Sequence, residues 1–151
     1  MGRLRYLRVA SSVASSSYSH VVADGDYAFV AGHLAADSKD SRVSLGDIEA
    51  ETRASMELLG HCLREVGLGW SDVVRVGVFM KDLSQFARMN KVYESFFEPG
   101  ELPARTTVGV ASLLFGCLVE IDCVARLRPA RVTKRGPRAM ARRSARARRR
   151  R

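Results

Sequence analysis

Hydrophobic and polar positions alternate along several stretches of the chain, and this pattern predicts β-strands. The segment 19–32 alternates and is rich in β-branched and aromatic residues, with Asp24-Gly25 between its two halves. An Asp-Gly pair between two such runs is a strong signal for a β-hairpin. Further strands are expected at 3–9, at 73–80, and as two apolar runs joined at Gly116 within 103–127.

Two other segments follow the helical period. Between Ile48 and Val66, apolar residues recur every three or four positions, with Asp47 as the expected N-cap and Gly67 as a stop. A second, shorter helix is expected from its cap at Ser84 to the stop at Pro99-Gly100, with one apolar side made of Phe86, Met89, Tyr93, Phe96 and Phe97. The predicted order of elements is therefore β-β-β-α-β-α-β-β, which is an α+β (α/β) fold.

The predicted strands raise a packing problem, because they are apolar on both faces. In 73–80, Val73 and Phe79 alternate with an expected core set of Val74, Val76, Val78 and Met80. A sheet that is apolar on both faces needs cover on both, and the two expected helices can cover only one. We therefore expect a second copy of the chain to cover the other face.

Two charged residues interrupt the last two strands. Arg105 shares its side of the strand with Thr107 and Gly109, whereas Glu120 alternates with the apolar set and should point away from the helix-packed core. An arginine and a carboxylate at a subunit boundary fit two interpretations, a structural ion pair or a binding site for an anionic small molecule. Spacing alone leaves both interpretations open.

The net charge of +9 comes from the C-terminal segment. Residues 128–151 hold 12 of the 25 basic residues and no acidic residue, which leaves 13 basic and 16 acidic residues in 1–127. We therefore expect one mildly acidic domain over 1–127 and an arginine-rich, disordered tail over 128–151. The tail has no aromatic residue that would stack on bases, so it predicts at most non-specific, salt-dependent contact with nucleic acid, or an appendage without a partner.

The remaining composition narrows the classes of protein. No run approaches the roughly 18 apolar residues of a membrane span, so no membrane partner is expected. The three cysteines form no Cys-x-x-Cys pair and the three histidines lack metal-ligand spacing, so we predict no metal and a reducing compartment, the cytoplasm. Residues 1–23 have the composition of a transit peptide, but we favour an edge strand at 3–9 as the explanation. A mitochondrial location stays open for a eukaryotic source.

Four segments are similar, in order and spacing, to the RidA (YjgF) family of reactive-intermediate deaminases. They are SYSHVVADGDYAFVAG, DIEAETRASMELL, DVVRVGVFMKDLSQFARMNKVYESFF and PARTTVGVASLLFGCLVEIDCVARL, and together they run from about Tyr18 to Leu127. The resemblance implies a chorismate-mutase-like sheet backed by two helices, and a homotrimer with a central barrel and active sites between subunits. It also implies hydrolysis of imines or enamines that carry a carboxylate, such as 2-aminoacrylate, to 2-keto acids and ammonia without a cofactor.

The resemblance also assigns roles to residues. Arg105 corresponds to the arginine that binds the substrate carboxylate, and Glu120 to the acid that activates the attacking water. The substrate-binding positions that it implies are Tyr18, Ala31, Gly32, Asn90 and Thr107.

Two departures from the family pattern bear on these roles. The family often has Ser-Gly-Gln where this chain has Ala31-Gly32-His33, and frequently a cysteine at Thr107. A polar contact is therefore either missing or supplied by His33. Two other functions remain open, a nucleic-acid-binding, translation-inhibiting or ribonuclease-like protein, and a trimeric module that binds small carboxylates without turnover.

Overall fold

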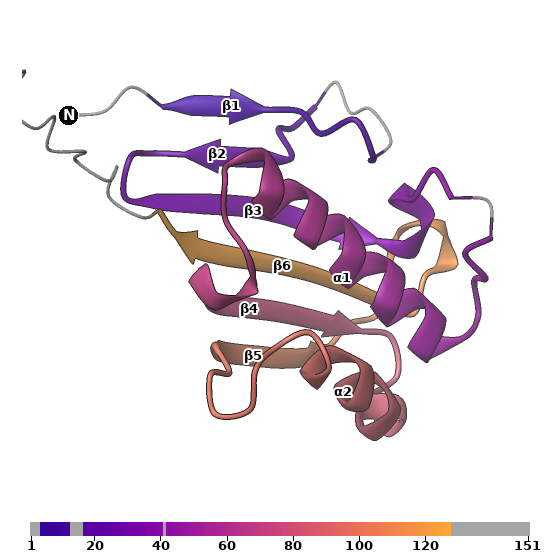
Figure 1. Cartoon of the computed structure of the whole chain (residues 1–151). Coiled ribbons are helices and arrows are strands. Elements are labelled where there is room, and N and C mark those ends of the chain that lie inside the picture. The colour runs from indigo at the N-terminus through magenta and orange to yellow at the C-terminus, as the bar shows by residue number, and fades with distance from the viewer. Residues whose placement is uncertain (1–3, 13–16, 41, 128–151) are drawn as a thin grey trace, which may run out of the picture.

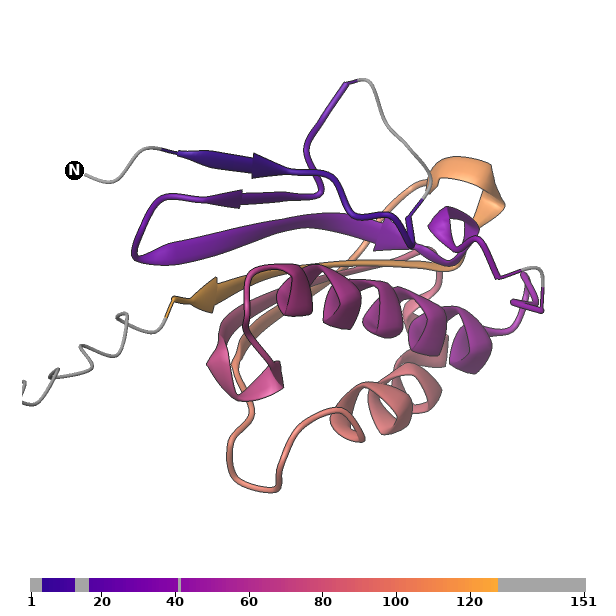
Figure 2. The same cartoon turned by 45° about the horizontal axis from the view of Figure 1, so that its top comes forward.

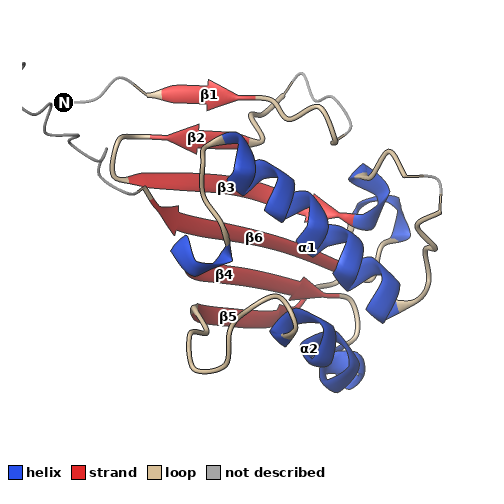
Figure 3. Ribbon diagram, viewed as in Figure 1, coloured by secondary structure: helices blue, strands red, loops and turns tan. Residues whose placement is uncertain are grey.

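The computed structural model describes residues 4–12, 17–40 and 42–127, so the predicted tail at 128–151 lies outside the described residues. The described chain forms one six-stranded sheet with two α-helices on one face (Figure 1, Figure 3). Its strands are β1 (Arg5–Leu7), β2 (Val21–Ala23), β3 (Tyr27–Leu34), β4 (Val73–Met80), β5 (Ala104–Gly109) and β6 (Val119–Arg126), and its helices are α1 (Ile48–Glu65) and α2 (Phe86–Glu94). This order along the chain confirms the predicted β-β-β-α-β-α-β-β pattern.

The strands lie in the order β1-β2-β3-β6-β4-β5 across the sheet. Every neighbouring pair is antiparallel except β4 and β5, which are parallel. The last two strands are therefore not neighbours, because β6 lies between β3 and β4 while β5 forms an edge. This order places the two charged residues of the last strands at different positions in the sheet.

The hairpin predicted at Asp24-Gly25 is present between β2 and β3. The Asp24 carboxylate accepts hydrogen bonds from the backbone N–H groups of Asp26 at 2.9 Å and Tyr27 at 2.7 Å. Gly25 has a φ of 107°, in the left-handed region that glycine tolerates best. β1 pairs with β2 at the edge of the sheet with Arg5 exposed, as expected for a short edge strand.

Helix α1 begins as predicted, because the Asp47 side chain accepts a hydrogen bond from the Glu49 N–H. Helix α2 differs from the prediction at both ends. Asp82 rather than Ser84 is the capping residue, since its side chain accepts from the Ser84 N–H and begins a short 3-10 turn before the helix. The helix then ends at Glu94, well before Pro99.

The core lies between the two helices and one face of the sheet (Figure 2). Fully buried side chains from both layers meet there, among them Met56, Leu59, Val76, Val78, Ile121 and Cys123. The buried carboxylate of Glu51 joins α1 to the start of β6, because it accepts 2.7 Å hydrogen bonds from the N–H groups of Gly46 and Leu118. These charge-assisted bonds fix the start of the strand that carries Glu120.

The first half of β4 corrects the sequence prediction. Its pairing with β6 shifts between Val73 and Arg75, so one extra residue is inserted at this point. As a result Val73 is buried, whereas Val74 is 42% exposed and does not belong to the core set as expected.

The face of the sheet away from the helices is uncovered in a single chain and carries exposed apolar side chains beside charged ones such as Glu120 and Asp122. Tyr27, Phe29 and Val108 are between 38% and 47% exposed on this side. Exposed apolar side chains that gather on one face are typical of interaction surfaces. The prediction that the strands carry apolar residues on both faces is thus confirmed, and the prediction that another copy of the chain covers the second face stays a prediction. In the part of the chain that the structure describes, neither helix has both the length and the apolar character to cross a bilayer.

Candidate active site

The residues that the sequence analysis assigned to a site form two groups in one chain. Asn90, Arg105 and Thr107 lie between β5 and α2. Tyr18, Ala31, Gly32 and Glu120 lie around the end of β3 and the start of β6.

The first group is built around Arg105. Its pairing with Val76 turns its side chain to the helix side of the sheet, where the Nη1 atom donates to Asn90 Oδ1 at 2.7 Å. The guanidinium carbon lies 4.6 Å from the centroid of the Tyr93 ring and 5.4 Å from that of Phe86. Contacts with aromatic faces hold the planar guanidinium while leaving its remaining N–H groups free to donate.

A cavity of about 230 Å³ opens beside this guanidinium, lined by Tyr93, Glu94, Leu102, Pro103 and Arg105. The Asn90 amide is held in place because its Nδ2 donates to Glu94 Oε1 at 2.6 Å. Thr107 lies on the same side of β5 as Arg105, and its buried Oγ1 has no hydrogen-bond partner among the described residues. A small cavity with a fixed cation at its wall suits a small anionic ligand.

The second group is built around Glu120, on the opposite face of the sheet. Gly32 packs directly on its carboxylate, since a Cβ at this glycine would overlap Glu120 Oε1. The pKa of Glu120 is raised, first by burial and then by the negative charges of Asp37 and Asp122. A carboxyl group whose pKa moves towards neutrality is suited to exchanging protons with a substrate or water.

Tyr18 belongs to the same group. Burial raises the pKa of its hydroxyl, and the nearby charges of Asp37 and Glu120 raise it further. Its ring packs edge-on against His20 at 5.8 Å, and the backbone of His20 in turn accepts a hydrogen bond from the Ala31 N–H. Tyr18, Ala31, Gly32 and Glu120 thus form one continuous patch.

His33 lies on the other side of the same strand. Its Nδ1 donates to the carbonyl of Ala31 at 2.8 Å, its Nε2 lies 3.0 Å from Ser12 Oγ, and the side chain is buried against Cys62 of α1. Within this chain the His33 side chain therefore packs in the core and stabilises β3, and it does not supply the polar contact beside Glu120. Burial lowers the pKa of its imidazole.

Arg105 and Glu120 do not meet within one chain. They lie on strands two positions apart, a lateral separation of about 10 Å, and on opposite faces of the sheet. The ion pairs between described residues involve Arg42 and Arg88 instead. An ion pair between Arg105 and Glu120 within one chain is thus excluded, whereas an ion pair across a subunit boundary and a binding site for an anionic small molecule both stay open.

Sequence reasoning missed several neighbours of these groups. The sequence pattern assigns Tyr93 and Glu94 only to a helix, although their spacing of three and four residues from Asn90 places all three on one helix face. Asp37 carries no sequence signal for its place near Glu120, because the 3-10 turn η1 (Ala35–Asp37) directly after β3 brings it there. Within the described ranges, no three His, Cys, Asp or Glu side chains cluster as a metal site requires.

The comparisons with known proteins define the family. The model of the family described as Endoribonuclease L-PSP matches residues 9–127, and the chain belongs to this family, which is the YjgF/RidA family of the resemblance noted above. A RutC family protein from Synechocystis sp. is 39% identical over 109 residues, which cover 72% of this chain and 84% of that protein.

Two further relatives link this family to an activity and to the fold. The 2-iminobutanoate/2-iminopropanoate deaminase of Rattus norvegicus is 30% identical over 112 residues, covering 74% of this chain and 81% of that enzyme. The solved structure of the YjgF gene product from E. coli is 30% identical and superposes with a TM-score of 0.75, covering 82% of this chain and 99% of that one. The predicted family and the fold of the sheet with its two helices are both confirmed.

Proposed function

We propose that this chain is a cofactor-free hydrolytic deaminase that converts 2-imino and enamine acids, such as 2-aminoacrylate, into 2-keto acids and ammonia. The observation that carries the proposal is the Arg105 guanidinium, held by Asn90 and two aromatic rings at the wall of a small cavity. Its remaining N–H groups match a carboxylate, which every such substrate bears. The deaminase from Rattus norvegicus, a relative of this chain, acts on substrates of this class.

The two groups of residues combine when a second copy places its Glu120 patch against the Arg105 cavity. We propose a homotrimer in which each active site takes Arg105 and Asn90 from one subunit and Glu120, Gly32 and Tyr18 from the next. The uncovered apolar face, with Phe29 47% exposed, supplies the surface for this assembly. Closed rings of identical subunits create such shared sites by symmetry.

The reaction needs positioning and a proton shuttle. Arg105 holds the substrate carboxylate, so that the C=N carbon faces a water molecule held by Glu120. The water oxygen adds to this carbon as Glu120 accepts a proton, and the proton passes to nitrogen. The carbinolamine then collapses: its hydroxyl proton passes through Glu120 to the nitrogen, the C=O bond forms as the C–N bond breaks, and ammonia and the 2-keto acid leave. An enamine first takes a proton on carbon and becomes the imine, so the same two residues serve both substrates.

The first test compares Arg105→Lys and Glu120→Gln with imines generated in place by an amino-acid oxidase. Arg105→Lys keeps the charge and loses the two-pronged contact, so ammonia release should fall steeply. Glu120→Gln keeps the size and removes the base, so substrate analogues should still bind while turnover falls by about 10²–10⁴. Arg88→Lys, an exposed arginine paired with Asp47 and Glu49, is the matched control and should be fully active.

A mixing experiment tests the shared site. Each variant is inactive alone, but a hybrid trimer contains interfaces where an intact Arg105 meets an intact Glu120. Random reassembly of equal amounts should restore about one quarter of wild-type activity, because a quarter of the interfaces combine the two intact halves. No recovery after verified subunit exchange would place the whole site within one chain.

The outcomes also separate the alternatives. Binding of carboxylates without any ammonia release would favour a binding module. The family description as an endoribonuclease motivates one further assay, cleavage of RNA by the same variants. RNA cleavage that depends on Arg105 and Glu120, with no imine hydrolysis, would replace the proposal.

A further inference from the structure

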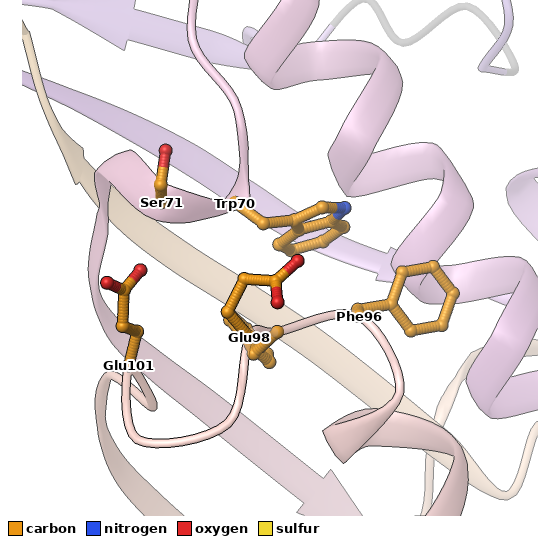
Figure 4. Close-up of a pocket in the computed structure, with 6 residues that line it drawn as sticks. Trp70, Ser71, Phe96, Glu98 and Glu101 are labelled. Atoms are coloured by element: carbon orange, nitrogen blue, oxygen red, sulfur yellow. The ribbon is translucent and has the colours of Figure 1, made fainter.

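A second cavity, of about 330 Å³, lies away from both groups of site residues. It forms between the 3-10 turn η2 (Trp70–Asp72) and the loop that follows α2, and is lined by Trp70, Ser71, Phe96, Phe97, Glu98 and Glu101 (Figure 4). Nothing in the proposed reaction uses this cavity, which combines aromatic rings with two carboxylates.

The lining has the chemistry of a cation site. The Trp70 ring meets Phe96 and Phe97 edge-on at 5.4 and 5.3 Å, which fixes its orientation. The Glu101 N–H donates to the Glu98 carbonyl at 3.0 Å, so a tight turn brings both acidic residues to the loop that lines the cavity. Both side chains are exposed, and neither forms an ion pair with a described residue. A guanidinium fits such a site, because it stacks on aromatic faces and donates to carboxylates at once.

The register of the sheet brings the C-terminal segment to the same place. Val73, which directly follows η2, pairs with Ala125 in the antiparallel ladder. Arg126 and Leu127, which follow Ala125, therefore lie at the same end of the sheet as η2, which precedes Val73. The last described residue, Leu127, donates its N–H to the Asp26 carbonyl at 2.8 Å, which holds it beside β3, and its side chain packs against the same hydrophobic core as Trp70 of η2. Residues 128–151 begin directly after Leu127, and 24 extended residues span up to about 80 Å, so the length of the segment does not limit its reach to the cavity.

Charge favours the same occupant. The segment 128–151 holds 12 basic residues and no acid, whereas 1–127 has 13 basic and 16 acidic residues. Attachment to the same chain keeps these arginines at high effective concentration around the cavity. We propose that an arginine of residues 128–151 docks in the cavity of its own chain, with its guanidinium against Trp70 and its N–H groups directed to Glu98 and Glu101.

Trp70 is the only tryptophan of the chain, so its fluorescence reports on this cavity alone. The full-length chain is compared with a full-length variant in which the 12 basic residues of 128–151 are replaced by Gln. Docking shields the indole from water, so the neutralised variant should emit at longer wavelength than wild type. Raising the salt to about 1 M, where the Debye length falls to about 3 Å, should shift wild type to the same value. Identical emission and identical salt response in both chains would overturn the proposal.

A synthetic peptide of residues 128–151 identifies the partner groups. Added to the neutralised variant at low salt, it should restore the wild-type emission. Glu98→Gln or Glu101→Gln in that background should each weaken peptide affinity about threefold, as expected for an exposed charge pair. Asp40→Asn, which removes an exposed carboxylate that is paired with Arg42 and does not line the cavity, is the matched control and should not change peptide affinity.

Two outcomes of these measurements would contradict the assignment. Peptide affinity that is insensitive to both glutamate substitutions would show that the tail binds elsewhere. Wild-type emission that changes with protein concentration would show that the occupant is the tail of another copy.

Discussion

Replacing Gly32 with alanine tests whether the position of the Glu120 carboxylate matters for the reaction. The added methyl group would occupy the space now taken by Glu120 Oε1, so the carboxylate has to move. Because the obstructing atom is the end of a flexible side chain and not backbone, the fold can absorb the change. The substitution therefore displaces the proposed base and leaves its chemistry intact.

The effect on stability follows from two opposing terms. Gly32 has no left-handed φ, so alanine reduces the entropy of the unfolded chain and stabilises the fold by about 0.4–1 kcal/mol. Forcing Glu120 away from its preferred rotamer costs about 0.5–1.5 kcal/mol. These terms nearly cancel, so the melting temperature should change by no more than about 4 °C for a domain of this size. Turnover should fall far more, by about 100-fold for a displacement of about 1 Å.

The measurement pairs thermal unfolding with ammonia release from imines. Gly69→Ala is the matched control, because its backbone φ of −136° suits alanine and no atom lies within 4 Å of the added methyl group. It carries the same entropy term without the collision and should keep full activity. Wild-type turnover in folded Gly32→Ala would refute the proposed role of Glu120. If activity falls only in proportion to the amount of folded protein, Gly32 has a role in packing and not in positioning Glu120.

Three further predictions concern stability. Because the pKa of Glu120 is raised in the folded state, its contribution to stability is present below the ordinary value of 4.5 and is lost as pH rises through the folded pKa. Glu120→Gln should therefore raise the melting temperature near neutral pH and leave it unchanged at about pH 4. If Glu120 instead forms a stabilising ion pair with another subunit, Glu120→Gln should lower the melting temperature near neutral pH. Because the pKa of His33 is lowered in the folded state, its contribution to stability is full above pH 6.5 and is lost as pH falls through the folded pKa. His33→Gln should therefore reduce the decrease in melting temperature between about pH 7 and pH 5. An unchanged decrease would show that other groups cause it. Asp82→Ala should lower the melting temperature more than Ser84→Ala, because Asp82 supplies the capping oxygen, and the reverse order would restore Ser84 as the cap.

The order of the elements was predictable because each has a local signal. The Asp24-Gly25 turn, the cap at Asp47 and the helical period of α1 depend only on neighbours in the sequence, and the structure reproduces all three. The errors come from features with weaker local signals. Val74 fits the alternation of its strand, and only the pairing with β6 reveals the inserted residue. Asp82 and Ser84 are both good capping residues, and the 3-10 turn before α2 decides between them.

The candidate site was predictable in part for the same reason. Alternation along β6 placed Glu120 on the face away from the helices, as the structure has it. The residues that contact Arg105 could not be predicted from alternation, because its contact with Tyr93 depends on how α2 packs against β5. Strand order was also hidden, because the alternation of a strand is the same at the centre of a sheet and at its edge.

Strand order connects assembly with catalysis. Because β6 lies inside the sheet, its Glu120 is held between two neighbouring strands and presents its carboxylate from a fixed position. Because β5 is an edge strand, its outer N–H and C=O groups lack a strand partner within the described sheet, and such an edge favours association with another chain. Arg105 lies on that edge strand. A neighbouring subunit that covers β5 therefore also approaches Arg105. In the proposed reaction, the substrate held by Arg105 needs a water molecule that a carboxylate activates. In the proposed trimer, the contact that satisfies the open edge is the contact that completes the site, so a folded but monomeric chain should bind carboxylates weakly and release no ammonia.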